Sequence, residues 1–239
     1  MPSYMRHSLN NSSQEKDLDS TQMTDETFWD QRYREATAVW SGNVNTALAD
    51  VVRERDLEPG RALDLGSGEG ADALWLAQNG WQTTGLDIST VAVQRAQAAA
   101  KAQGFSEAQV RFEAADLLSG WRSDLTFDLV TASFLQSPVA FDRQRALQIA
   151  QDLVAAGGRL LVISHASFPP WAKAHHEAVD HDHKHETTTP ETELELLRFD
   201  ERRWSVEIAE LRSREITAPN GDQVSLDDTV ILARRTGWE

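Results

Sequence analysis

The chain has 239 residues, a net charge of −15 and no cysteine. Its length suits one α/β domain, and its 40% hydrophobic and 26% charged residues are ordinary for a globular protein. The acidic balance argues against nucleic-acid and membrane-surface partners, and the lack of cysteine excludes disulfides, thiolate nucleophiles and cysteine metal sites. No stretch has the pattern of a signal peptide or the length of a membrane span, so we expect a cytoplasmic protein.

Residues 1–24 are polar, and we expect them to form a disordered N-terminal tail. Residues 25–239 have the features of a single domain. Asp25 is predicted to cap a first helix, and a second helix is expected from about Val44 to Arg55. The segment of about 25–58 is rich in aromatic residues and precedes the first strand. It therefore either packs on the domain or forms a helical lid over a ligand.

The stretch from Arg61 to Asp87 has the order strand, glycine turn, helix, strand, acid. The apolar run Ala62 to Leu65 is typical of a buried parallel strand, and three closely spaced glycines follow it. A helical pattern then ends at Asn79-Gly80, and a second strand leads to Asp87. Glycines let a ligand approach the backbone and the acid can bind ribose hydroxyls, so this stretch predicts a nucleotide-type pocket.

Strands and helices continue to alternate after Asp87, which indicates a parallel sheet with helices on both faces. The later elements are expected as helices at 90–103, 142–156 and 192–198, and as strands at 109–113, 127–131, 159–164, 204–212 and 224–234. The last two strands form a hairpin around Asn220-Gly221-Asp222. The sequence therefore predicts an α/β fold with a Rossmann-like, doubly wound sheet, mostly parallel, that ends in an antiparallel hairpin.

Ligands of a doubly wound sheet bind at the carboxyl edge of the parallel strands. Four stretches are predicted to meet there, each after a different strand: Asp64–Gly70, Asp87-Ile88, Ala115-Asp116 and Ser133-Phe134. Asp87 can accept two hydrogen bonds from a ribose diol, and Asp116 can accept one from an adenine amino group. Ile88 and Leu117 can hold the two faces of a purine. The alternative is that both acids merely cap the helices that follow them.

The sequence Asp64-Leu65-Gly66-Ser67-Gly68-Glu69-Gly70 resembles the first motif of class I S-adenosylmethionine-dependent methyltransferases. Asp87, Asp116 and the strand Phe127-Asp128-Leu129-Val130 fall where that family has its next three motifs, and the resemblance covers roughly residues 28–235. It implies a seven-stranded methyltransferase fold and S-adenosylmethionine as cofactor. The implied cofactor-binding residues are Asp64, Gly66, Ser67, Gly68, Gly70, Asp87, Ile88, Ala115, Asp116, Leu117 and Ser133. Ser67 stands where many members have cysteine.

Within the family, Phe28-Trp29, Arg32-Tyr33, Trp40 and Asn45 are similar to the small-molecule branch of tellurite-resistance and thiopurine methyltransferases. That branch implies a small-molecule acceptor, in agreement with the acidic charge, which argues against nucleic-acid and membrane partners. The sequence has no signal for the identity of the acceptor or for the oligomeric state. One alternative is a non-catalytic adenosylmethionine-binding or regulatory domain on the same fold. Another is an NAD-binding oxidoreductase, although the absence of a separate substrate domain argues against it.

Methyl transfer from a sulfonium is an in-line displacement, so the protein mainly supplies position and a fitted electrostatic site. A general base is needed only when the acceptor must lose a proton. His165 follows the fifth predicted strand and is the candidate catalytic residue, either as base or as a group that steers an anionic acceptor. The alternative is a structural histidine. Trp40 and Phe134 either wall the acceptor pocket together with His165 or are core aromatics.

Histidines gather between the fifth strand and the last helix, at His175, His176, His181, His183 and His185. Three of them alternate and would share one face of an extended segment, which invites a metal-site interpretation. The stretch has no pattern of an ordered element, whereas metal sites need fixed ligands and fixed supporting groups. We therefore expect no metal and interpret the segment as a solvated loop on the substrate side.

Overall fold

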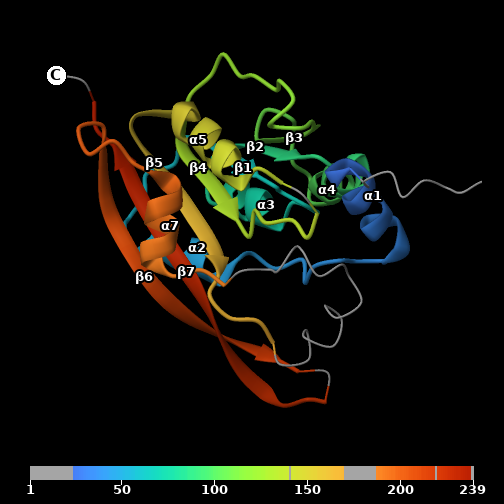
Figure 1. The fold of residues 1–239 in the computed structure, drawn as a ribbon. Helices are drawn as coiled ribbons and strands as arrows, with labels where there is room; N and C mark the ends of the chain where they lie inside the picture. The colour runs from blue at the N-terminus through green and yellow to red at the C-terminus, as the bar shows by residue number, and fades with distance from the viewer. Residues whose placement is uncertain (1–23, 140, 170–186, 219, 238–239) are drawn as a thin grey trace, which may run out of the picture.

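The computed structural model of the protein describes residues 24–139, 141–169, 187–218 and 220–237. Across these residues, seven strands form one sheet in the order β3-β2-β1-β4-β5-β7-β6 (Figure 1). Strands β1 to β5 run parallel, and β7 runs antiparallel to both of its neighbours, β5 and β6. The predicted fold class is therefore confirmed: an α/β, Rossmann-like sheet with a C-terminal antiparallel hairpin.

The parallel strands are short and mostly buried, because helices cover both faces of the sheet. They are β1 Arg61–Leu65, β2 Gln82–Asp87, β3 Val110–Ala114, β4 Phe127–Ser133 and β5 Val154–His165. Helices α2 (Thr46–Glu54) and α3 (Ala71–Gln78) pack on one face, and α5 (Arg143–Leu153) and α7 (Pro190–Leu197) pack on the other. None of the described helices is both long and apolar enough to span a membrane.

Several helices begin at a side chain that caps their free N–H groups. Ser89 caps α4 (Thr90–Ala102), as predicted, and Asp142 caps α5. The first helix, α1 (Asp25–Glu35), begins differently from the prediction that Asp25 caps it. Thr24 is the cap, because its Oγ1 accepts a hydrogen bond from the backbone N–H of Thr27. The Asp25 carboxylate instead accepts a hydrogen bond from the Ser137 hydroxyl and so ties α1 to the loop after β4.

The junction between α5 and β5 also differs from the prediction. The helix ends at Leu153 rather than at Ala156, and the strand begins at Val154. Gly157 has a φ of 80°, and a Cβ on Gly158 would lie 2.8 Å from the Phe127 carbonyl oxygen. The pairing of β4 with β5 shifts register at this point. The glycine pair therefore shapes an irregular start of the strand instead of ending the helix.

The C-terminal hairpin consists of β6 (Trp204–Thr217) and β7 (Gln223–Arg235) and is longer than predicted. Its turn falls at residues 220–222, as expected. Figure 1 shows the turn end of the hairpin reaching beyond the parallel sheet. The register places Asp228 of β7 beside the last residue of β5, His165. The hairpin thereby contributes side chains to the carboxyl edge of the sheet.

A buried ion pair joins α7 to this edge. Both Glu193 carboxylate oxygens accept hydrogen bonds from the Arg143 guanidinium, each at 2.9 Å, and Glu193 is 1% exposed. The same guanidinium donates to the Leu135 carbonyl at 2.9 Å and to the Ser164 hydroxyl at 2.7 Å. One largely buried cation, with its side chain 14% exposed, thus connects α5 and α7 to the loop after β4 and to the end of β5.

Glu193→Ala is expected to lower the free energy of unfolding by about 3–5 kcal/mol, because it leaves the Arg143 guanidinium buried without its counter-ion. Urea unfolding followed by circular dichroism measures this change. Glu195→Ala on the exposed face of the same helix is the control and is expected to change stability by less than about 0.5 kcal/mol. Equal losses in the two variants would contradict the structural role of the pair.

Candidate functional site

The turn between β1 and α3 needs glycine at three positions, where any other residue would be strained or would clash. Gly66, Gly68 and Gly70 all have positive φ, at 70°, 53° and 88°. A Cβ on Gly70 would lie 2.7 Å from the Phe112 ring. On Gly68 it would lie 2.9 Å from the Tyr33 hydroxyl oxygen. The turn therefore exposes backbone rather than side chains to the carboxyl edge of the sheet, as the sequence predicted.

The carboxylate of Asp87 holds this turn. Its Oδ2 accepts a hydrogen bond from the Gly68 N–H and its Oδ1 accepts one from the Ser89 N–H, both at 2.8 Å. Asp87 is 8% exposed, and burial raises its pKa to about 6 although both hydrogen bonds act in the opposite direction. Each oxygen keeps a lone pair for a further donor, such as a ribose hydroxyl.

Two more acids surround the turn. Asp64, at the end of β1, is 2% exposed and accepts a hydrogen bond from the Thr131 hydroxyl at 2.9 Å. Asp72, in the first turn of α3, accepts one from the Asn45 N–H at 2.7 Å. Burial raises the pKa of both, and the nearby charges of Asp72 and Asp87 raise that of Asp64 further. A cationic ligand beside these carboxyl groups would favour their ionised forms and lower their pKa values again.

Helix α1 is fixed to the start of α4 through a fourth acid, the buried Asp30. Its Oδ1 accepts a hydrogen bond from the Ser89 hydroxyl at 2.6 Å, and its carboxylate also accepts from Thr90 and from the Val91 N–H. Burial works to raise the pKa of Asp30, but these hydrogen bonds and Arg34 hold it below the usual range. Because Ser89 also donates its N–H to Asp87, the helix is connected to the glycine turn.

The segment after α1 is fixed to the glycine turn itself. Glu69 Oε2 accepts hydrogen bonds from the N–H groups of Val39 and Trp40, at 3.1 and 3.2 Å. Arg95 of α4 pairs with Glu69 Oε1 at 2.9 Å and also donates to the carbonyls of Tyr33 and Ala36. Sequence reasoning missed Asp30 and Arg95, and it gave Glu69 no role although it lies in the glycine motif.

The residues predicted to bind the base follow β2, β3 and β4. Ile88 is partly exposed, whereas Leu117 is 8% exposed and packs in the core below the edge. The Ala115 N–H donates to the Asp87 carbonyl at 2.9 Å, and Asp116 Oδ1 accepts from the Leu118 N–H at 2.7 Å. Ala115, Asp116 and Leu117 therefore follow the strand next to that of Asp87, whereas Ser133 ends β4, two strands away on the other side.

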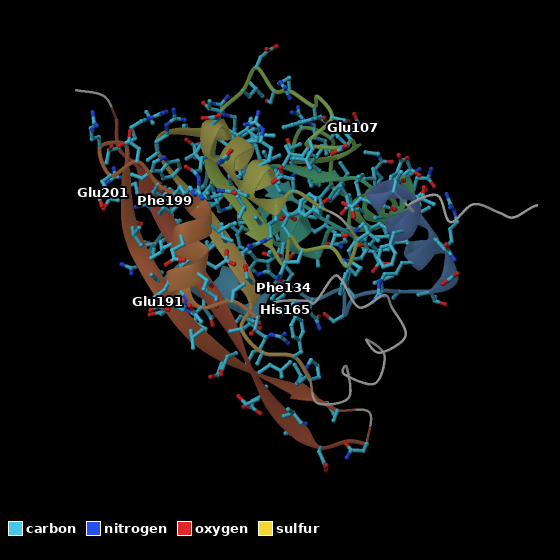
Figure 2. The ribbon with its side chains drawn as sticks, in the orientation of Figure 1. Glu107, Phe134, His165, Glu191, Phe199 and Glu201 are labelled. Atoms are coloured by element: carbon cyan, nitrogen blue, oxygen red, sulfur yellow. The ribbon has the colours of Figure 1, made fainter. Side chains whose placement is uncertain are left out.

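Phe134 and His165 form the opposite end of the site. Their rings stack with centroids 4.0 Å apart and planes 13° from parallel, and Figure 2 shows them side by side. Phe134 has a φ of 53°, a strained conformation for an aromatic residue. Among the described residues, Trp40 makes no ring contact with Phe134 or His165. It is 49% exposed, and its Nε1 donates to the Tyr33 hydroxyl at 2.8 Å beside Gly68, at the glycine-turn end.

The histidine cluster at 175–185 lies outside the described residues. Within the described ranges, no group of three or more histidine or acidic side chains is arranged to hold a metal ion. Two surface hollows, of about 400 and 520 Å³, lie away from the glycine turn. The first lies between α2 and β6 and the second includes Pro59 and Asp128, at the amino ends of β1 and β4.

Residues 58–213 match a family model described as a methyltransferase domain. The chain belongs to this methyltransferase family. The class I methyltransferase prediction is therefore confirmed, with S-adenosylmethionine as the cofactor. A curated relative, 2-heptyl-1-hydroxyquinolin-4(1H)-one methyltransferase of Mycobacteroides abscessus, is 33% identical over 114 residues, which are 46% of this chain and 49% of that protein. The matches span less than half the length of the curated relatives, from 34% to 49%.

Solved structures agree with the fold. A protein studied for the conversion of a disulfide bond into a thioacetal group during echinomycin biosynthesis has a TM-score of 0.66 and 26% identity, covering 89% of this chain and 93% of that one. The 1,6-didemethyltoxoflavin-N1-methyltransferase of Burkholderia thailandensis, with bound 1,6-didemethyltoxoflavin and S-adenosylhomocysteine, has a TM-score of 0.62 and 20% identity. It covers 89% of this chain and 87% of that one.

The residues at the carboxyl edge fit this cofactor. S-adenosylmethionine carries a positive sulfonium and an α-ammonium group, and three carboxylates with raised pKa values stand around the glycine turn. The Ser67 hydroxyl is buried without a hydrogen-bond partner among the described residues. The donor set and the charge thus suit a cationic nucleoside.

The pKa of Asp87 predicts how cofactor binding depends on pH. Its folded value of about 6 exceeds its ordinary value of 3.8, so the folded protein binds more protons between these two pH values. The ligand-free protein therefore loses stability as pH rises through 6, relative to Asp87→Asn. The sequence predicts that Asp87 accepts hydrogen bonds from the ribose, which the ionised carboxylate does best, so S-adenosylmethionine is expected to raise Tm more at pH 7.5 than at pH 5. Thermal shifts that are equal at the two pH values would contradict this assignment.

Proposed function

We propose that this protein is an enzyme that transfers the methyl group of S-adenosylmethionine to a small-molecule acceptor. The observation that carries the proposal is the placement of Asp87. This buried acid bridges the glycine turn and the start of α4, and it ends β2 at the edge of the sheet where such ligands bind. The proposal keeps the single domain at 25–239 and the cytoplasmic location that were expected from the sequence.

Each part of the proposed cofactor site has a chemical role. Asp87 accepts hydrogen bonds from the ribose hydroxyls and Asp116 accepts one from the adenine amino group, with Ile88 and Leu117 against the purine. Asp64 and the backbone of Gly66 face the charged amino-acid end. Bound S-adenosylmethionine supplies an activated methyl group, so the protein needs only to align the acceptor and exclude water.

The segment 25–58 acts as a lid in this proposal. Asp30, Glu69 and Arg95 fasten it to α4 and the glycine turn, and Tyr33 and Trp40 stand directly over Gly68. A lid fixed at this place shields the cofactor from water and leaves the Phe134 and His165 end for the acceptor. The net charge of −15 opposes binding of a phosphate backbone, which favours a small molecule over a nucleic acid.

Asp87→Asn is expected to weaken S-adenosylmethionine binding by about 100-fold or more, because two hydrogen bonds to an ionised acceptor lose their charge. Isothermal titration calorimetry measures the affinity. Asp128→Asn is the matched control. Asp128 also accepts a backbone hydrogen bond, from Arg61 N–H at 2.7 Å, but it lies at the amino end of β4. Equal affinities of the two variants would show that Asp87 does not bind the cofactor.

Turnover separates an enzyme from a cofactor-binding regulatory domain. S-adenosylhomocysteine release is measured with thiols, small amines, aromatic hydroxyl compounds, tellurite and selenite. The enzyme proposal predicts release above the acceptor-free rate with at least one class. Tight binding of S-adenosylmethionine without release in any class would favour the regulatory alternative.

A further inference from the structure

A buried nitrogen of His165, Nδ1, faces a buried carboxylate oxygen of Asp228. Asp228 of β7 pairs directly with His165 of β5 across the antiparallel strands, and its Oδ1 lies 3.7 Å from His165 Nδ1. Within the described ranges, neither atom has a hydrogen-bond partner, and both are buried. The gap exceeds the usual upper limit for an N–H···O hydrogen bond, about 3.2 Å, by roughly 0.5 Å. A small movement of the ring therefore completes a hydrogen bond that satisfies both atoms.

The Asp228 carboxylate is fixed in this direction. The residue is 1% exposed, and its Oδ2 accepts a hydrogen bond from Arg214 Nε at 2.6 Å. Arg214 also lies 5.6 Å above the centre of the Phe134 ring, so one guanidinium contacts both partners of the histidine. With Oδ2 engaged by this cation, Oδ1 is the oxygen that the carboxylate presents to the imidazole.

The imidazole of His165 lies at the carboxyl edge of the parallel strands. It is stacked on Phe134, and the His165 side chain is 27% exposed although its Nδ1 is buried. The exposed part of the side chain therefore does not include Nδ1. Strand β5 is two strands from β1, so His165 lies roughly 10 Å across the sheet from the glycine turn. The two ends of the site are thus separated by the end of β4.

We propose that Asp228 is a positioning residue that keeps His165 protonated at Nδ1, so that Nε2 acts as the general base toward the methyl acceptor. This inference rests on the methyl-transfer function proposed above, and it narrows the acceptor to a weakly acidic aromatic hydroxyl or aromatic ring N–H. Such a group must lose its proton, and the Phe134–His165 stack offers apolar surface beside the base. Acceptors that are already anionic, such as selenite, need no base.

The reaction balances with these groups alone. The proton of the acceptor hydroxyl or N–H moves to His165 Nε2, and the oxygen or nitrogen forms a bond to the methyl carbon. The bond between that carbon and the cofactor sulfur breaks, and its electron pair stays on sulfur, so the products are the methylated acceptor and S-adenosylhomocysteine. The imidazolium that forms has its positive charge opposite the Asp228 carboxylate.

The histidine tautomer tests the positioning role without turnover. In ¹⁵N-labelled protein at pH 8, long-range ¹⁵N–¹H correlation spectra distinguish a protonated Nδ1 from a protonated Nε2, and the spectrum of His165→Gln assigns the signal among the 7 histidines. The inference predicts the Nδ1–H tautomer in the wild type and a shift toward Nε2–H in Asp228→Asn. Nε2–H in the wild type, or the same tautomer ratio in both proteins, would overturn it.

Kinetics test the consequence for the acceptor. With 2-naphthol or 4-hydroxyquinoline, Asp228→Asn is expected to lower kcat about tenfold or more, and His165→Gln about 10²- to 10⁴-fold, while affinity for S-adenosylmethionine is unchanged. Asp227→Asn alters the opposite face of the same strand and is the matched control, with Tm reporting on folding. An unchanged kcat in a folded Asp228→Asn, or turnover with selenite but neither aromatic probe, would overturn the inference.

The two proposals fail in different ways. Absence of S-adenosylmethionine binding, or of product release with every acceptor, overturns the proposed function, and the tautomer measurement on the ligand-free protein then decides the pairing of His165 with Asp228 independently.

Discussion

The two hydrogen bonds that Asp87 accepts from Gly68 and Ser89 are the contact on which the rest of the site depends. They join the turn after β1 to the helix after β2, and Ser89 passes the connection on to Asp30 and therefore to α1. Burying this carboxylate is unfavourable for its ionised form, because burial raises its pKa to about 6. A carboxylate kept in such a place without a cation suits a site that a charged ligand completes.

Buried acids elsewhere in the protein differ from Asp87 in having an arginine as hydrogen-bond partner. Glu193 is matched on both oxygens by Arg143, and one oxygen of Asp228 is matched by Arg214. Around the glycine turn, Asp64 and Asp87 instead have neighbouring acids that raise their pKa values. The contrast separates acids that are paired with an arginine from acids that have other acids beside them. Asp228 differs from both groups, since one of its oxygens is paired with Arg214 and the other faces His165.

Local patterns in the sequence were sufficient to predict the alternating elements, the sheet class and the glycine turn with its acids, since strand period, glycine spacing and capping residues all lie close together in the chain. The end of α5 was misplaced because Gly157-Gly158 can either end a helix or bend a strand. The sequence could not show that Arg95 reaches Glu69, or that Asp228 pairs with His165, since these contacts depend on strand order and register. The roles of the predicted cofactor residues remain proposals.

A crystal structure with bound S-adenosylhomocysteine tests the central claim most directly, because it shows which side chains meet each part of the cofactor. The account predicts that both ribose hydroxyls lie within hydrogen-bonding distance of the Asp87 carboxylate, with the sulfur turned toward the end of the site formed by Phe134 and His165. A ribose bound away from Asp87, with its bonds to Gly68 and Ser89 unchanged, would show that this acid only holds the fold, and it would contradict the account.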